Sequence, residues 1–285
     1  MFDLEAYLKE KKRIIDAALD NEMPGENVPP FLLHKAMRYS VFSGGKRLRP
    51  IICLAAAEAV GASTEAAILP SLAVELLHTY TLIHDDLPCM DDDDLRRGKP
   101  TCHIVYGEAN AVLAGDALQA LAFEVLTKVV VPPPYPPNQL VAELAHAAGS
   151  RGVVGGQVED IAVDDKPTID IAEYVHLHKT ADLFRTAARI GSIAGGAEKR
   201  EMEALTEYGM NLGLAFQIAD DLLDATSADD EKREKMTCLS VYAPEKARER
   251  ADKLSNKAIS AIGDLDKTFT EPLIALAKFA IERKY

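Results

Sequence analysis

The chain has 285 residues, 48% hydrophobic and 6% aromatic, which is enough apolar content for a large core and favours packed helices over a β-sandwich. A formal net charge of −13 argues against nucleic acid as a partner, and four Cys without CxxC spacing argue against a zinc site or disulfide framework. With no recognisable signal peptide and no apolar run of membrane-spanning length, we expect a cytoplasmic protein without membrane insertion.

Helical periodicity dominates, and no alternating strand pattern or repeat is found. In the first half, helices are expected over 3–19, over 31–60 with an interruption at 44–45, and from 63 to an acidic cluster. Residues 107–131 are apolar nearly all round, which predicts a central buried helix. A proline-rich connector at 132–137 ends this helix.

Beyond the connector, the same periodicity continues to the end of the chain. Further helices are expected over 138–149, 153–163, 169–194, 199–223, 245–262 and 271–283. The simplest organisation is one all-α domain, a helical bundle that spans residues 1–285.

Two acidic clusters stand beside apolar helical sequence. The first begins at Asp85-Asp86 and runs through Asp91, and the second is Asp220-Asp221-Leu222-Leu223-Asp224. Crowded carboxylates beside a core cost free energy unless a cation neutralises them. Mg²⁺ prefers oxygen ligands and is often held by one or two carboxylates plus substrate phosphates. We therefore predict one shared metal site for a diphosphate, although either cluster alone could be a solvated acidic face.

Positive charge for such an anion is available in three segments, GGKRLRP at 44–50, RRGK at 96–99 and HKT at 178–180. Glycines let the backbone approach a ligand, and Lys and Arg suit phosphate oxygens. His78 precedes Asp85 by two helical turns and lies on the same helix face. Each feature alone is weak evidence, but together with two acidic clusters they favour a diphosphate site.

These motifs resemble the trans-isoprenyl diphosphate synthase (polyprenyl synthetase) family, and most closely the bacterial farnesyl diphosphate synthases. The matching segments are GGKRLRP (44–50), HTYTLIHDDLPCMDDDDLRRGKPT (78–101), GEANAVLAGDAL (107–118), GGQVED (155–160), HKT (178–180) and FQIADDLLD (216–224). The resemblance covers nearly the whole chain. It implies an all-α bundle around a deep central cavity, and a homodimer.

The resemblance also implies a role for individual residues. Two Mg²⁺ ions would be bound by Asp85, Asp86 and Asp91. A third Mg²⁺ would be bound by Asp220 and Asp224, with Asp221 beside them. The allylic diphosphate would be held by Arg96, Lys179 and Thr180, with Gln217 close by. Isopentenyl diphosphate would be held by Lys46, Arg49, His78 and Arg97.

The implied reaction joins isopentenyl diphosphate to dimethylallyl or geranyl diphosphate. Mg²⁺ and the basic residues would stabilise the departing pyrophosphate, and the allylic cation would be shielded from water. The double bond of isopentenyl diphosphate attacks this cation and a proton is then lost. No protein nucleophile is required, and the released pyrophosphate is the expected base.

Product length should depend on the helix that leads to Asp85. The growing chain is expected to run towards Thr81 and Tyr80, four and five residues before Asp85. Bulky Tyr80 would close the cavity early, which predicts farnesyl diphosphate (C15). Geranylgeranyl diphosphate (C20) is the alternative, in which case Tyr80 is an ordinary core residue.

The sequence departs from the family after Asp224, where a Gly/Lys-rich stretch normally precedes a KxTYP element. Here Lys235 is left as the candidate lysine for the allylic diphosphate. Either the chain is naturally shortened, or it has lost part of its activity, or the sequence omits a mobile lid, which we favour. A smaller departure is Ala181-Asp182 in place of the usual Gly, which places an extra acid near the predicted allylic site.

Three alternatives compete with chain elongation. A terpene cyclase shares an acidic first motif, but GGKRLRP and a complete second motif oppose it. A weakly catalytic subunit of a heteromeric prenyl synthase is supported only by the shortened segment. A generic helical scaffold would leave the ordered motifs unexplained.

Overall fold

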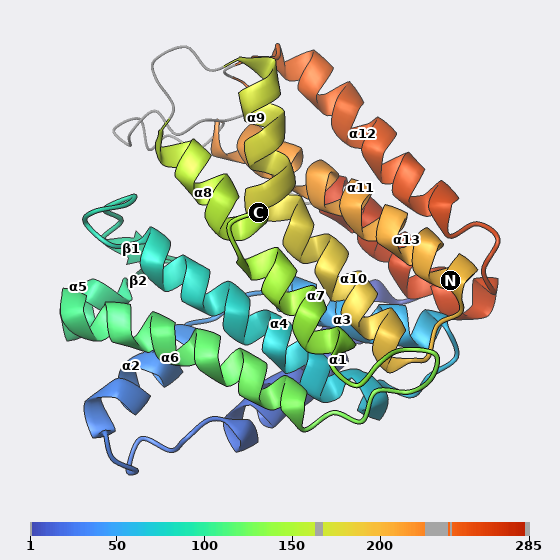
Figure 1. The fold of residues 1–285 in the computed structure, drawn as a ribbon. Helices are drawn as coiled ribbons and strands as arrows, with labels where there is room; N and C mark the ends of the chain where they lie inside the picture. Colours follow the sequence, from blue (N-terminus) through green and yellow to red (C-terminus); the bar gives the residue numbers. More distant parts are fainter. Residues whose placement is uncertain (1, 163–167, 226–238, 240, 283–285) are drawn as a thin grey trace. The chain divides into compact units, whose positions relative to one another are not determined.

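The computed structural model describes residues 2–162, 168–225, 239 and 241–282 (Figure 1). These residues are helical with a single short β-hairpin, which confirms the all-α prediction. They form two compact units, described separately below. Unit 1 comprises 1–4, 52–67 and 131–285, and unit 2 comprises 5–51 and 68–130.

Unit 2 holds the N-terminal helices and the hairpin. Its elements are α1 (Leu4–Glu22), α2 (Phe31–Val41), the first turn of α3 (Leu48–Ala59), most of α4 (Thr64–Asp85), β1 (Leu95–Arg96), β2 (Lys99–Pro100), α5 (Cys102–Tyr106) and α6 (Glu108–Thr127). The break predicted at 44–45 is confirmed, because Gly44 and Gly45 have φ of 109° and 111°, which glycine adopts far more easily than other residues. The antiparallel β1–β2 pair was not predicted, because two residues are too few to show alternation.

Unit 1 holds the rest of α3 and the helices that follow the proline-rich connector. These are α7 (Gln139–Ala148), α8 (Val153–Ile161), α9 (Ile169–Val175), the π-helix η1 (His176–Ala181), α10 (Asp182–Ala194), α11 (Lys199–Asp224), α12 (Pro244–Ala261) and α13 (Lys267–Glu282). The helix expected over 169–194 is therefore interrupted by a π-helical segment. Figure 1 shows α10, α11 and α12 lying side by side.

Close helix contacts hold unit 1 together. The rings of Phe184 on α10 and Phe216 on α11 lie 4.9 Å apart. Fully buried Tyr208 donates its hydroxyl to the carbonyl oxygen of Leu273 on α13, at 2.7 Å. The α10 backbone approaches α3 at Gly191, where a Cβ atom would lie 2.0 Å from the carbonyl oxygen of Cys53. Only glycine fits this crossing, because the opposing atom belongs to the backbone and cannot move alone.

Gly191→Ala should therefore destabilise the protein. At an open helical position this change would add about 0.5–1 kcal/mol of stability. Here overpacking should instead cost about 1–3 kcal/mol. Thermal unfolding followed by circular dichroism would test this, and an unchanged or higher melting temperature would contradict the close approach of α10 to α3.

Two helices, α4 and α6, are long and apolar enough to cross a membrane, with window hydropathies of 1.4 and 1.3. The prediction that no apolar run reaches this length is therefore wrong. In α4, 67% of the window is buried within the protein, as in the core helix of a globular fold. In α6 only 44% is buried, and Leu113 is 55% exposed. The prediction of a fully buried central helix over 107–131 is therefore also wrong, because α6 presents an apolar face to the outside.

Candidate active site

The predicted site residues fall into one group on each unit. Unit 2 carries Lys46, Arg49, His78, Tyr80, Thr81, Asp85, Asp86, Asp91, Arg96 and Arg97. Unit 1 carries Lys179, Thr180, Gln217, Asp220, Asp221 and Asp224, and Asp224 is the last residue of α11. Lys235 lies outside the described residues. The prediction that the two acidic motifs share one metal site stays a prediction.

On unit 2, Arg97 lies against the glycine loop. Its Nη1 donates to the carbonyl oxygen of Gly44 at 2.5 Å. A Cβ atom at Gly45 would lie 2.4 Å from the same Nη1, so the guanidinium can take this place only beside a glycine. Burial lowers the pKa of Arg97 from its ordinary value. The structure thus brings Arg97, from the basic segment after the first acidic motif, onto the GGKRLRP loop.

His78 and Arg49 form the second contact of this basic group. Arg49 Nη1 lies 3.1 Å from His78 Nε2. Burial, and then the charges of Arg49, Arg97 and Arg96, hold the pKa of His78 well below its usual range. A neutral imidazole can accept a hydrogen bond at Nε2 from Arg49, so His78 orients the guanidinium without adding charge. His78 and Arg97 therefore contact the loop that carries Lys46 and Arg49, the other two residues predicted to hold isopentenyl diphosphate.

The first acidic motif begins where α4 ends. The backbone N–H of Asp91 donates to the carbonyl oxygen of Asp85 at 2.9 Å, which folds the motif back on itself. Asp86 is buried, and its Oδ1 accepts a hydrogen bond from Arg96 Nε at 2.7 Å. Burial raises the pKa of Asp86, although the bond with Arg96 opposes this. Arg96, predicted to contact the allylic diphosphate, is therefore paired with a carboxylate predicted to bind Mg²⁺.

Backbone strain concentrates in these same two segments. Among the residues that the structure describes, three other than glycine have positive φ: Arg47 at 53°, Asp92 at 54° and Arg97 at 55°. Such conformations cost about 1–3 kcal/mol each and persist where surrounding contacts hold them, often at functional sites. Arg47 lies in the glycine loop, Asp92 lies in the acidic run after α4, and Arg97 lies in the basic segment that follows this run.

On unit 1, the π-helical segment η1 presents Lys179 and Thr180. Lys179 Nζ donates to Asp160 Oδ2 of α8 at 2.5 Å. A Cβ atom at Gly156 would lie 2.3 Å from the backbone nitrogen of Lys179, so α8 packs directly on η1. Single π-helical turns inside α-helices are common at functional sites. Asp160 was not predicted as a site residue, although it ends the GGQVED motif.

A hydrogen-bonded chain links η1 to the second acidic motif. Thr180 Oγ1 donates to Gln217 Oε1 at 2.7 Å, and Gln217 Nε2 donates to Asp221 Oδ1 at 2.7 Å. His176 Nε2 lies 3.3 Å from Asp221 Oδ2, without the alignment of a hydrogen bond. The buried Asp221 carboxylate therefore has Gln217 at one oxygen and His176 near the other. His176 was not predicted as a site residue.

The extra acid Asp182 has partners inside the protein. It is buried, and it contacts His178 Nδ1 of η1 at 2.7 Å and Arg185 Nη2 of α10 at 3.1 Å. The Arg185 guanidinium therefore offsets the charge of this carboxylate. The concern that Asp182 would repel a diphosphate is correspondingly reduced.

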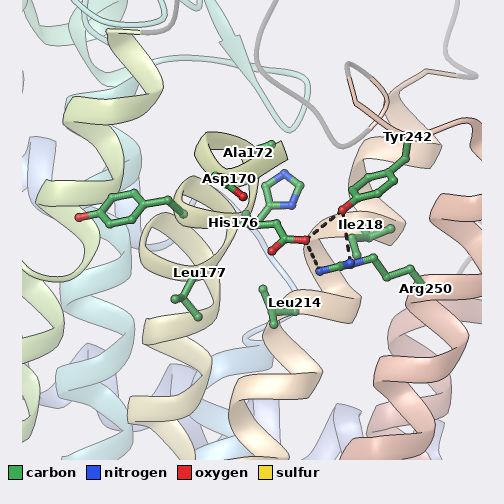
Figure 2. Close-up of a pocket in the computed structure, with 10 residues that line it drawn as sticks. Asp170, Ala172, His176, Leu177, Leu214, Ile218, Tyr242 and Arg250 are labelled. Carbon is green, nitrogen blue, oxygen red and sulfur yellow. Dashed lines mark hydrogen bonds and ion pairs between the residues drawn. The ribbon is translucent and has the colours of Figure 1, made fainter. Parts of the chain in front are cut away.

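A cavity of about 290 Å³ lies beside η1 (Figure 2). Figure 2 shows Leu177, Leu214 and Ile218 along it, with Tyr242 and Arg250 across from His176. Arg250 Nη2 and the Tyr242 hydroxyl both donate to Glu173 Oε1, at 2.7 and 2.9 Å. The Arg250 bond ties α12 to α9, and the Tyr242 bond ties the segment just before α12 to the same carboxylate. His176 is the link between this cavity and the second acidic motif.

The donor chemistry of both acidic motifs suits Mg²⁺. Among the residues that the structure describes, no three His, Cys, Asp or Glu side chains are gathered as a ready-made metal site. Mg²⁺ commonly needs only one or two carboxylates when substrate phosphates complete its coordination. Asp85, Asp86 and Asp91 offer oxygen ligands alone, so the residues fit the ion once Asp86 is released from Arg96.

Comparison with known proteins now identifies the chain. The polyprenyl synthetase family model matches residues 30–270. The chain belongs to the polyprenyl synthetase family. All of the motifs and site residues named above lie within the matched range. Trans-prenyltransferase activity follows from this membership.

The relatives agree on the family but differ in their named products. "Heterodimeric geranylgeranyl pyrophosphate synthase large subunit 1, chloroplastic" of Arabidopsis thaliana is 42% identical, covering 99% of this chain and 80% of its own length. An FPP/GFPP synthase structure from Zymomonas mobilis is 39% identical with a TM-score of 0.89, covering 98% of both chains. A geranylgeranyl pyrophosphate synthetase structure from Pyrococcus horikoshii is 32% identical with a TM-score of 0.90, covering 99% of this chain and 98% of its own.

The match to the Arabidopsis protein runs over 299 residues, whereas the chain has 285, so that relative contains residues with no counterpart here. The shortened segment after Asp224 stays a prediction. Residues 226–238, where the departure was found, lie outside the described residues.

Proposed function

We propose that this prenyltransferase condenses isopentenyl diphosphate with dimethylallyl or geranyl diphosphate and stops at farnesyl diphosphate (C15). The observation that supports this product is the aromatic stack on α4. Tyr80 is only 7% exposed, and its ring meets the His84 imidazole edge to face at a centroid distance of 5.2 Å. A Cβ atom at Gly115 of α6 would lie 2.2 Å from His84 Nε2, so α6 holds this stack from behind. A bulky ring with a fixed backing is suited to stopping chain growth.

The chain's own residues supply binding and orientation. Lys179, Thr180 and Arg96 would hold the allylic diphosphate, and Lys46, Arg49, His78 and Arg97 would hold isopentenyl diphosphate. α3 begins at Leu48, within the GGKRLRP segment, so the partial positive charge at the N-terminus of this helix adds to the attraction for an anion. Fixed charges and dipoles of this kind favour the departure of pyrophosphate, because they need no rearrangement during reaction.

The bond changes balance without a protein nucleophile. The allylic C–O bond breaks and leaves pyrophosphate, and the double bond of isopentenyl diphosphate forms the new C–C bond. The proton then lost restores a double bond and passes to the pyrophosphate. Mg²⁺, when bound, would neutralise the diphosphate charge, and Asp85, Asp86, Asp91, Asp220 and Asp224 are the residues proposed to hold about three ions.

Geranylgeranyl diphosphate (C20) is the second candidate product. It is favoured by the names of relatives such as the Arabidopsis protein, which is called a geranylgeranyl pyrophosphate synthase large subunit. The same name describes a heterodimeric enzyme, so a weakly catalytic subunit of a heteromeric synthase is a further alternative. A product assay distinguishes these functions, using radiolabelled isopentenyl diphosphate, Mg²⁺ and either dimethylallyl or geranyl diphosphate. We expect C15; C20 would overturn the product length, and no product from the protein alone would favour the heteromeric role.

We further propose that the protein is a homodimer in the cytoplasm. Val112 and Leu113 on α6 are 39% and 55% exposed, and α8 carries a separate exposed apolar stripe at Val154, Val158 and Ile161. Exposed apolar surface of this kind often marks a protein–protein interface. It supports a second copy of the chain as the partner.

Leu113→Glu should therefore convert a dimer to a monomer, because it would bury a carboxylate without a partner in the interface. Sedimentation equilibrium would show the mass fall by half. Val130→Glu is the matched control, since Val130 is 92% exposed and lies outside α6. A wild-type protein that sediments as a monomer would sink the proposal.

A further inference from the structure

Arg47 is the one Arg of the GGKRLRP loop to which the family resemblance gave no role. It stands between Lys46 and Arg49, which are proposed to hold isopentenyl diphosphate. Arg47 is only 3% exposed, so its charge is directed into the protein. The loop therefore combines a buried arginine with two cations assigned to a ligand.

Three contacts on different parts of unit 2 hold the Arg47 guanidinium. Its Nε donates to Asp16 Oδ1 of α1 at 2.8 Å. Its Nη1 donates to Glu75 Oε1 of α4 at 2.7 Å, and its Nη2 donates to the carbonyl oxygen of Val41, at the end of α2, at 2.5 Å. The Glu75 side chain is buried as well, so this ion pair is removed from water. Arg47 thus ties the loop to three helices at once.

The backbone of Arg47 also has a special conformation. Its φ is 53°, which a branched or long side chain adopts rarely and only where other contacts hold it. Its carbonyl oxygen accepts a hydrogen bond from the N–H of Ile51 at 3.0 Å, so the left-handed residue lies at the start of α3. A change of φ here would rotate the chain on both sides of Arg47.

We infer that Arg47 is a positioning residue for the isopentenyl diphosphate site, acting through Asp16 and Glu75 to fix the turn that presents Lys46 and Arg49. This rests on the proposed function, because it assigns the loop to that substrate. Burial alone would lower the pKa of Arg47, but Glu75 and Asp16 raise it, so the guanidinium stays charged. Because these ion pairs hold the turn at Arg47 in place, Lys46 and Arg49 keep defined positions on either side of it.

A positioning role of Arg47 must be distinguished from a contribution of Arg47 to the stability of the fold. Removing Arg47 alone leaves Glu75 buried without its partner, which can prevent folding. The double variant Arg47→Met/Glu75→Met removes both charges together and replaces the pair with apolar side chains, which proteins often tolerate. Asp16 keeps its contact with Lys12 in this variant.

We expect the double variant to fold and to bind isopentenyl diphosphate about tenfold more weakly, as for the loss of one charge-assisted hydrogen bond. Isothermal titration of isopentenyl diphosphate without an allylic substrate measures this binding directly. In steady-state assays, KM for isopentenyl diphosphate should rise by a similar factor while KM for geranyl diphosphate changes less than about twofold. Unchanged binding and KM in a folded double variant would overturn the inference.

A control variant tests a partly buried ion pair that is far from the loop in sequence. Arg189 Nε and Nη2 donate to Glu143 Oε2 and Oε1 at 2.7 and 2.6 Å, and both residues lie in unit 1. Arg189→Met/Glu143→Met should leave KM for both substrates as in the wild type. An equal rise in the control would mean that the effect is general destabilisation, which also overturns the inference. If wild-type protein itself does not bind isopentenyl diphosphate, the proposed function fails, and the inference fails with it.

Discussion

Asp85→Ala and Asp220→Ala should each lower turnover by at least about 10²- to 10³-fold, the range found when one group that stabilises a charged transition state is removed. Each variant removes a carboxylate from one of the two acidic motifs, and with it a proposed ligand of Mg²⁺. Stability should hardly change, because crowded carboxylates repel one another in the absence of a cation. The measurements are kcat at saturating Mg²⁺ and the thermal melting temperature.

The same acidic run supplies the control. Asp94 is exposed and carries no proposed metal role, so Asp94→Ala should keep near wild-type turnover. Equal losses in Asp94→Ala and Asp85→Ala would mean that the run acts only through its summed charge. Wild-type activity in either Asp85→Ala or Asp220→Ala would show that the metal assignment is wrong.

Tyr80→Ala should lengthen the product from C15 to C20 or beyond. The change removes the ring that packs on His84 and opens space on α4 five residues before Asp85. Removing a buried aromatic ring should also cost about 3 kcal/mol of stability, so the assay is best run at low temperature. Chromatography of the dephosphorylated products gives the chain length directly.

Tyr80→Phe is the matched control, because it keeps the ring and removes only the hydroxyl. It should still give C15. If Tyr80→Ala also gave only C15, another residue would close the cavity. If the wild type already gave C20, the ring would be a core residue without a role in product length.

Much of the fold could be predicted because the chain marks its own helix boundaries. Gly44-Gly45 and the prolines at 132–137 separate helices that the structure places at α2, α3, α6 and α7. The burial of α6 could not be predicted in the same way. A helix that is apolar all round has the same sequence pattern whether all of its faces are buried or one of them is exposed, so periodicity alone cannot separate the two.

The site was predictable where a motif carries its own chemistry. The contact of Arg49 with His78 and that of Arg97 with the glycine loop join residues from the predicted set. The residues that hold this set in place, such as Asp16, were not predicted. Asp16 is one acid among many on a charged amphipathic helix, and nothing in its local sequence shows that it meets Arg47 31 positions later. Such long-range partners are determined by tertiary packing.

Because η1 is a π-helical turn, deleting one residue there should affect the structure differently from a deletion in a regular α-helix. In a regular helix, losing a residue rotates everything beyond it by about 100° and separates the buried face from its partners. A π-turn already contains a surplus residue, so a deletion within His176–Ala181 could restore regular α-helical geometry. The helix could then keep its packing while Lys179 and Thr180 lost their present directions. This short segment is thus a place where a length change could uncouple folding from chemistry.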